Sequence, residues 1–189
     1  MNSYHPHYEI EIIDGTDPTS YFTFCVADIP KNEIIYDKDI KVVGRIISIE
    51  EGDVDCFLAY FLKKYYDPTL FYNSHQDLDD DEKEAFYWWL VENVYTYEAM
   101  SAMCDEIIKV ADLLDRDFFN PELEDVKKEF SIFYMSDNDD IDHINSDCSP
   151  KAIHRHAYVV VDFYRRFVNY IRKMMMDHPE CNLITISGP

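Results

Sequence analysis

Two acidic segments hold the residues best suited to binding. Residues 77–84 read DLDDDEKE and residues 137–148 read DNDDIDHINSDC. The first has the carboxylates of a calcium loop, but the sixth and twelfth positions from Asp77 are Glu82 and Trp88, where such a loop needs glycine and an acid. Acids also stabilise the start of a helix, and a presented acidic segment suits a basic partner. We therefore expect partner binding by Asp77, Asp79, Asp80, Asp81, Glu82, Asp137, Asp139, Asp140 and Asp142.

The second segment also combines carboxylate, imidazole and thiol donors, in Asp140, His143, Asp147 and Cys148. Transition metals accept all three donor types, so a metal site would be expected here before elsewhere. However, these residues are expected on a loop, which does not fix ligands at i, i+3 or i, i+4 as a helix does, and Asp and Asn are common in solvated turns. We therefore expect no metal and no cofactor. A small metal-dependent hydrolase that uses this loop remains an alternative.

Residues 151–173 are the most basic part of the chain, with six of its seventeen Lys and Arg residues. Residues 151–177 carry six bases and two acids, a net charge of +4, whereas the rest carries 11 bases and 36 acids, a net charge of −25. Opposite charges of this size attract each other. We therefore expect the basic side chains to pair with carboxylates of the chain itself, or with those of a second copy in a homodimer. A stripe that binds anions or a protein is the alternative.

His154 and His156 lie two positions apart in this basic segment. On a helix they would point about 200° apart, so they cannot bind one metal ion together. His156 falls on the apolar side of the helix, which favours a structural role in the core. That side also holds Ile153, Val160, Phe163, Phe167, Tyr170, Ile171 and Met174.

Arg172 and His178 are separated by five residues near the end of the same helix. Their spacing resembles the R-x(4–6)-H motif of the HEPN-family ribonucleases, and this resemblance implies a ribonuclease that uses these two residues. The chain departs from the family pattern after the arginine, where Lys173 replaces the usual polar residue, and Pro179 directly follows the histidine. A HEPN-like ribonuclease is therefore kept as a second alternative.

Composition narrows the class of protein. The chain has 189 residues, a net charge of −21, and 47% hydrophobic residues, so it can build a folded core but repels nucleic acids and anionic membranes. The five cysteines are odd in number and form no C-x-x-C pair, and no stretch of eighteen apolar residues occurs. We expect a cytoplasmic protein with no direct nucleic-acid or membrane partner.

No catalytic signature accompanies this composition. The chain lacks G-x-S-x-G, G-x-x-x-x-G-K-[ST] and H-E-x-x-H, and it has only four glycines. We therefore expect a non-catalytic acidic protein that engages a basic protein partner. An inhibitor, immunity or anti-defence protein that covers the phosphate-binding surface of a nuclease, as a nucleic-acid mimic does, would have this composition.

The N-terminal third and the C-terminus predict strands. Residues 8–13 alternate apolar and acidic side chains, and residues 20–27 are rich in aromatic and β-branched residues, which predicts a hairpin of the two. Residues 39–50 predict a third strand in which Gly44 marks a bulge or bend. Residues 182–187 predict a closing strand that adds to the N-terminal sheet.

Helical periodicity dominates the middle of the chain. It predicts a helix over 54–67 with Asp53 as N-cap, and a long apolar stripe over 82–116 with a kink or break near 96–102. A helix capped by Asn120 and a final helix from Ser149 and Pro150 to about Asp177 follow. The fold class is α+β: a small, mostly antiparallel sheet packed on about five helices, in a single domain over 1–189 (1–52 mainly strands, 53–178 mainly helices, 182–187 a closing strand).

Overall fold

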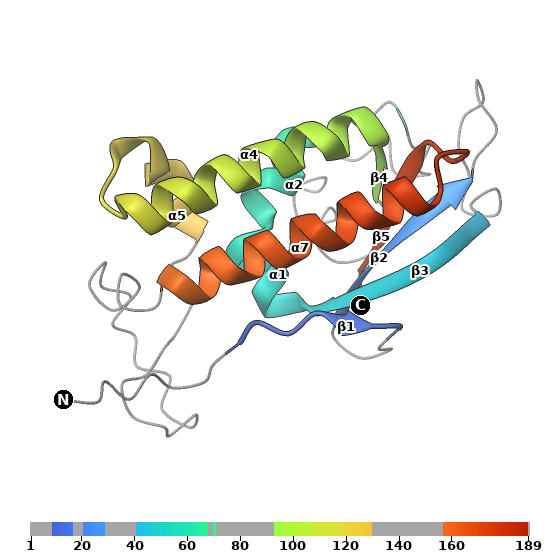
Figure 1. Ribbon diagram of the computed structural model, residues 1–189, viewed down its shortest axis with the longest axis horizontal. Coiled ribbons are helices and arrows are strands. Elements are labelled where there is room, and N and C mark those ends of the chain that lie inside the picture. The colour runs from blue at the N-terminus through green and yellow to red at the C-terminus, as the bar shows by residue number, and fades with distance from the viewer. Residues whose placement is uncertain are drawn as a thin grey trace, which may run out of the picture.

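The computed structural model describes residues 9–16, 21–28, 41–67, 70, 93–129 and 157–188. Over these residues the fold is α+β, as expected: five antiparallel strands form one sheet, and two long helices lie side by side across one of its faces (Figure 1). The described helices are α1 (Glu51–Phe57), α2 (Ala59–Tyr65), α4 (Tyr97–Arg116), α5 (Glu124–Glu129) and α7 (Ala157–Asp177), with a 3-10 turn, η2 (Pro121–Leu123).

The sheet joins strands from both ends of the described chain. Its order is β1-β3-β2-β5-β4, with all neighbours antiparallel. The C-terminal strand therefore adds to the N-terminal sheet, as predicted, and lies between β2 and β4. The strands are β1 (Ile13–Asp14), β2 (Tyr21–Asp28), β3 (Lys41–Glu50), β4 (Asn93–Thr96) and β5 (Leu183–Ser187).

The predicted hairpin of the first two strands is wrong, because β1 pairs with β3 and not with β2. Strand β3 is ten residues long and carries β2 along one edge, while Ile13 and Asp14 pair with its other edge at Ser48 and Ile47. Residues 9–12 are not in a strand, although Ile10 is buried and Glu9 and Glu11 are exposed as the alternation predicted.

Gly44 lies in a bulge of β3, as the sequence indicated. Cys25 pairs with Ile46 and the next residue, Val26, pairs with Val43, so Gly44 and Arg45 are extra residues in β3. The φ angle of Gly44 is +74°, and a Cβ there would clash with Nε2 of His178. Both the backbone and the neighbouring ring therefore require glycine.

Arg45, the other bulge residue, connects β1, β3 and α7. Its Nε and Nη2 donate to the two carboxylate oxygens of Asp14 at 2.8 and 2.9 Å. Its guanidinium also lies 4.5 Å from the ring centroid of Tyr170 on α7. The bulge thus directs one side chain onto both its neighbouring strand and the helix layer.

The first helical region differs from its prediction in two ways. The chain breaks the helix at Leu58, which separates α1 from α2 although its N–H still donates to the carbonyl of Val54 at 2.8 Å. Asp53 is not the N-cap, because α1 begins two residues earlier and Asp53 is buried inside it. A carboxylate in the first turn of a helix suits the macrodipole at either position, so the sequence alone could not distinguish them.

Residues 93–96 form a strand where the sequence predicted a helix. Asn93 to Thr96 pair with β5, and the side chain of Thr96 then caps α4 by accepting a hydrogen bond from the N–H of Ala99 at 3.1 Å. The predicted break at 96–102 is therefore confirmed, but it is a change from strand to helix. The Asn120 cap is also confirmed, because its Oδ1 accepts from the N–H of Glu122 at 3.0 Å.

The core lies between the sheet and α4 and α7. The rings of Phe24 in β2 and Phe167 in α7 meet edge-on with centroids 5.3 Å apart. Buried tyrosines satisfy their hydroxyls, since Tyr164 donates to the carbonyl of Phe57 at 2.8 Å and Tyr95 to that of Leu62 at 3.0 Å. Within the described part of the last helix, the predicted apolar side is buried at Val160, Phe163, Phe167, Ile171 and Met174 and partly buried at Tyr170, and the helix ends at Asp177, ahead of Pro179, as predicted.

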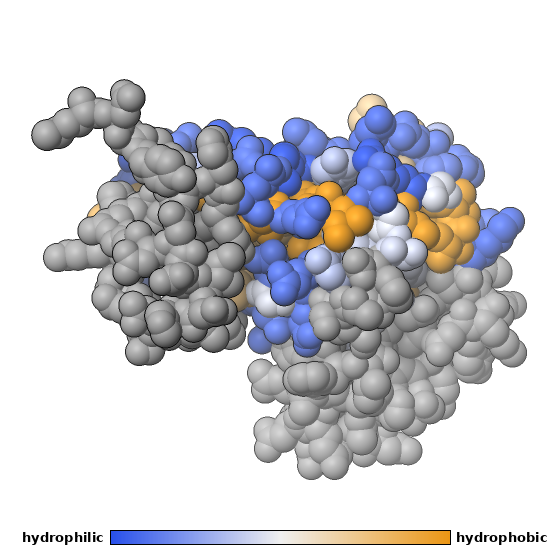
Figure 2. Space-filling view, turned by 90° about the horizontal axis from the view of Figure 1, so that it is seen from below, coloured by the Kyte–Doolittle hydropathy of each residue, from blue (hydrophilic) through white to orange (hydrophobic). Residues whose placement is uncertain are grey.

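Seen from below, the described surface shows a strip of apolar residues bordered by hydrophilic ones (Figure 2). Partly or fully exposed apolar side chains of the first and third strands include Ile13, Val42, Val43 and Ile46. Lys41 and the Gly44–Arg45 bulge lie beside them on β3. Lysines and bulges hinder the edge-to-edge pairing of strands. This part of β3 therefore has the features of a protected sheet edge.

Candidate functional site

The nine acids predicted to bind a partner lie outside the described residues. The same holds for the loop donors Asp140, His143, Asp147 and Cys148, and for His154 and His156. The start predicted for the last helix, at Ser149 and Pro150, is also outside them. These assignments therefore stay predictions.

The basic helix α7 pairs with carboxylates of the chain itself, as expected. Arg165 Nη2 donates to Asp112 at 3.1 Å and to Asp115 at 3.2 Å, and Arg172 Nη2 donates to Asp105 at 2.5 Å. All three acids belong to α4, which runs beside α7 (Figure 1). The two hydrogen-bonded aspartates raise the pKa of Arg165. These ion pairs therefore connect two neighbouring helices.

Arg166 connects α7 to the N-terminal segment instead. Its Nε donates to Asp162 at 2.7 Å, its Nη1 lies 3.3 Å from Glu9, and its Nη2 donates to the carbonyl of Ile10 at 2.9 Å. The three arginines at positions 165, 166 and 172 are thus engaged within the molecule.

Arg172 and His178 are engaged with different elements. Arg172 pairs with Asp105 of α4, whereas the ring of His178 lies over Gly44 of β3, with Nδ1 3.3 Å from Glu180 Oε1. The carbonyl of His178 also accepts from the hydroxyl of Tyr97 at 3.0 Å. These contacts fasten the end of α7 to the start of α4 and to the bulge.

A groove of about 420 Å³ lies between α2, α4, η2 and α5. Its floor is apolar and buried, formed by Val110 and Leu113 of α4 and Val126 of α5. The remaining lining residues are Tyr60, Lys64, Asp105, Glu106, Lys109 and Glu122. An apolar floor within a charged rim is the usual composition of a recognition site.

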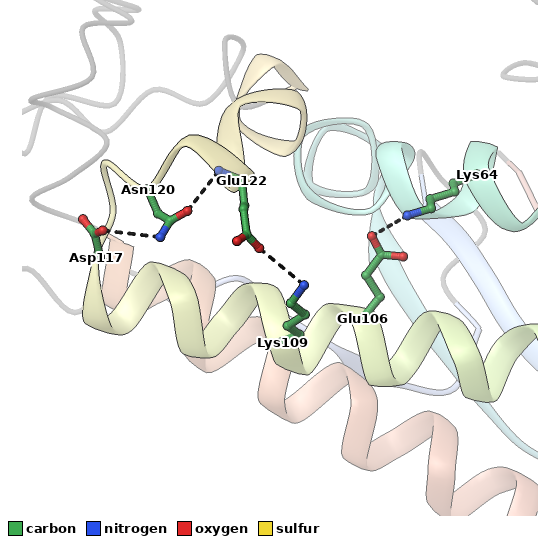
Figure 3. A network of polar contacts seen from close by, with 6 residues as sticks. All are labelled: Lys64, Glu106, Lys109, Asp117, Asn120 and Glu122. Carbon is green, nitrogen blue, oxygen red and sulfur yellow. Dashed lines mark hydrogen bonds and ion pairs between the residues drawn. The ribbon is translucent and has the colours of Figure 1, made fainter.

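One side of the groove holds a lysine between a carboxylate and two aromatic rings. Lys64 Nζ donates to Glu106 Oε1 at 2.6 Å (Figure 3), and the hydroxyl of Tyr65 donates to Glu106 Oε2 at 2.7 Å. The same ammonium lies 5.7 and 5.8 Å from the ring centroids of Tyr60 and Tyr65. Carboxylate and aromatic faces both attract a cation, so this wall of the groove is a cation site that the chain itself occupies.

The pKa values of this cluster keep it charged at neutral pH. Burial alone would raise the pKa of Glu106, but hydrogen bonds from Lys64 and Tyr65 lower it below its usual value. The hydrogen bond to Glu106 raises the pKa of Lys64. Burial, followed by the hydrogen bond to Glu106, raises the pKa of Tyr65 to about 12, so this hydroxyl stays a donor.

The other side of the groove carries a looser ion pair. Lys109 Nζ lies 3.4 Å from Glu122 Oε2, and their side chains are 69% and 66% exposed (Figure 3). The backbone of Glu122 is fixed because its N–H donates to the Asn120 cap, whose Nδ2 lies 3.5 Å from Asp117 Oδ2. Exposed pairs of this kind contribute about 0–1 kcal/mol. Glu122 is therefore well placed but weakly paired.

The described residues that line the groove are apolar, aromatic and charged, and no serine, threonine, cysteine or histidine is among them. Within the described part of the chain no group of three or more His, Cys, Asp or Glu side chains is placed to hold a metal ion. The described cysteines, Cys25, Cys56, Cys104 and Cys181, are buried thiols outside any disulfide, and burial raises the pKa of Cys104 to about 12, which leaves its thiol protonated.

Sequence reasoning missed this groove. Lys64 and Glu106 are 42 positions apart on separate helices, and each fits the polar side of an ordinary amphipathic helix. The one local signal is that Tyr60 and Lys64, like Glu106 and Lys109, have helical i, i+4 or i, i+3 spacing. Nothing in that spacing shows that the two pairs face each other.

Fold and groove together define an α+β protein with a charged groove on its helical layer. No protein-family model, no curated protein and no solved structure matches this chain. Among the described helices, none is long and apolar enough to cross a membrane.

Proposed function

We propose that the protein is a non-catalytic binding protein that engages a basic protein partner, such as a nuclease, as an inhibitor, immunity or anti-defence protein. The observation that supports this most is the engagement of α7. The arginines that could have bound an anion instead pair with the chain's own acids at positions 9, 105, 112, 115 and 162.

The acids of the chain far outnumber the bases that could pair with them. Even if each of the 17 Lys and Arg residues neutralised one of the 38 acids, 21 acids would stay uncompensated. Such an excess attracts basic proteins over long range and speeds their association at low ionic strength. It also opposes binding to nucleic acids, whose phosphates carry the same charge. The cysteines that stay thiols in the described residues favour a reducing compartment, and we propose a cytoplasmic location.

The test is affinity capture at low salt followed by rate measurements with the captured protein. We expect a basic protein, whose association rate constant falls steeply as ionic strength rises from about 50 to about 500 mM, because the attraction is screened. Capture of no basic protein at low salt, or association that does not depend on salt, would contradict the proposal.

A ribonuclease that uses Arg172 and His178 is the competing proposal. It predicts cleavage of RNA by the purified chain and loss of cleavage in Arg172→Ala and His178→Ala. Because Arg172 pairs with Asp105 and His178 with Glu180, the melting temperature of each variant has to be measured beside its activity. If the wild type cleaves RNA and the variants lose this activity while keeping the wild-type melting temperature, the ribonuclease would replace the binding proposal.

A further inference from the structure

We infer that the groove between α2, α4, η2 and α5 receives an arginine side chain of the basic partner. This inference rests on the proposed function and adds the place and the chemistry of contact. It follows from three features: the apolar floor, the cation site on one wall, and a weakly paired carboxylate on the other.

The floor suits the aliphatic part of a long basic side chain. Val110, Leu113 and Val126 present methyl groups at the bottom of a groove of about 420 Å³. Arginine and lysine bury their methylene stems on apolar surface while the charged end reaches polar groups. A short acidic or hydroxyl side chain would leave this floor uncovered.

The wall formed by α2 shows that the groove attracts cations. The ammonium of Lys64 is held there by Glu106 and lies near the rings of Tyr60 and Tyr65. A guanidinium has the same preference for aromatic faces and carboxylates, is less strongly hydrated than an ammonium, and binds a carboxylate through two parallel hydrogen bonds. Arginine is therefore better suited than lysine to the carboxylate on the opposite wall, while Lys64 keeps its own contacts.

Glu122 is the carboxylate that an incoming arginine can take. Its pair with Lys109 is long and exposed at both ends, so exchanging Lys109 for a partner's guanidinium costs little. The Asn120 cap holds the backbone of Glu122 in place, which reduces the ordering needed on binding. Lys64 and Glu106 stay paired, because their contact is shorter and Tyr65 supports it.

The charges of the rim favour this occupant over the other classes. Each rim carboxylate has a basic partner, since Asp105 pairs with Arg172, Glu106 with Lys64 and Glu122 with Lys109, so the acidic excess is that of the whole chain, −21. An anionic group would meet this excess, and a purely apolar segment would remove the Lys64–Glu106 pair from water without replacing its hydration. A guanidinium adds a partner for Glu122 instead.

The experiment uses the full chain with labelled methyl groups and a defined probe, the capped tripeptide acetyl-Gly-Arg-Gly-amide. Its control is the same peptide with citrulline, which keeps the shape of arginine and loses the charge. We expect the arginine peptide to shift the methyl resonances of Val110, Leu113 and Val126, with the citrulline peptide at least tenfold weaker. Equal binding of both peptides, or shifts that avoid these three methyl groups, would overturn the inference.

Three variants locate the charge. Glu122→Gln should weaken binding of the arginine peptide roughly three- to tenfold, since it removes one charge-assisted contact, and Lys109→Gln should strengthen it because Glu122 is released. Glu124→Gln is the matched control, an exposed acid two positions away that does not line the groove. An equal loss in Glu122→Gln and Glu124→Gln would show general attraction to acids, which overturns the groove but leaves the proposed function standing.

The captured partner separates the two proposals further. If Glu122→Gln weakens the partner complex and Glu124→Gln does not, both the function and the groove are supported. If a basic partner binds but neither variant changes its affinity, the groove inference fails alone. If no basic partner binds at low salt, the proposed function fails.

Discussion

Asp53 is a buried carboxyl at the start of α1, with 8% of the residue exposed. Burial, together with repulsion from Glu50, raises its pKa from 3.8 to about 6. Because the folded state binds the proton more tightly than the unfolded state, Asp53 destabilises the fold above about pH 6. This cost is relieved as the pH falls through 6 towards 4.

Replacing Asp53 removes this cost. We expect Asp53→Asn to raise the free energy of unfolding by ~1–3 kcal/mol at pH 8, and the gain to disappear near pH 4, where the carboxyl is neutral in the folded protein. Urea unfolding of variant and wild type at both pH values checks this, with the neighbouring Glu51→Gln as control. A gain that is equal at pH 4 and pH 8 would show that ionisation of Asp53 is not its cause.

Gly44 gives the second prediction for a single residue. Gly44→Ala places a Cβ against the ring of His178 and forces alanine to a φ of +74°. We therefore expect the free energy of unfolding, measured by heat or urea, to fall by about 2–4 kcal/mol. Adding His178→Ala should recover part of this loss, because the clash disappears while the backbone strain remains. No recovery in the double variant would show that strain alone explains the loss.

Single residues were predicted well where local chemistry decides. Gly44 and Asn120 could be identified because bulges and helix caps demand particular residue types at particular positions. Asp53 was misjudged, because an aspartate near the start of a helix suits both a cap and a first-turn position, and its burial depends on residues far away in the sequence.

At the scale of elements, the ion pairs between α4 and α7 predict that reversing the charge of an arginine on α7 lowers the stability of the protein. Arg165→Glu would face Asp112 and Asp115, so we expect lower stability by about 1 kcal/mol at low salt and a smaller loss at high salt. Adding Asp112→Lys should restore stability. Arg166→Glu should likewise lower stability or assembly more than partner binding, since its contacts are with Glu9, Ile10 and Asp162.

Lys173→Glu is the control for these reversals. It makes the same change of charge on the same helix, and Lys173 makes no ion pair within the described residues. A loss of stability as large as that of Arg165→Glu would assign the effect to overall charge. Lost partner binding with unchanged melting temperature and assembly state would show that α7 serves the partner and not the fold.

Helices and strands could be predicted where the residues of the element itself determine its conformation. The apolar face of α7 and the composition of β5 are visible in the sequence, and both elements are present. Strand β4 was missed because Asn93 to Thr96 are a strand only through pairing with β5, about ninety positions away. The pairing of β1 with β3 was missed for the same reason, since sequence proximity suggested β2.

At the scale of the molecule, the sequence predicted the fold class and the pairing of basic residues with acids of the same chain. The groove could not be predicted, because it exists only where α2, α4, η2 and α5 meet. Under the proposed function, the charge of −21 attracts basic proteins over long range, and the groove is the proposed contact for one of their arginine side chains.

The place of β5 in the sheet has a consequence for how the protein is made. Because β5 lies between β2 and β4, no ribosome can release a closed sheet before Leu183 to Ser187 have left the exit tunnel. Until then β4 has no neighbour in the sheet, and α4, which follows it directly, has no fixed anchor there. This sheet therefore closes only after residues 13–187 have all been made, and until then the edge of β2 is the surface that chaperones would have to guard.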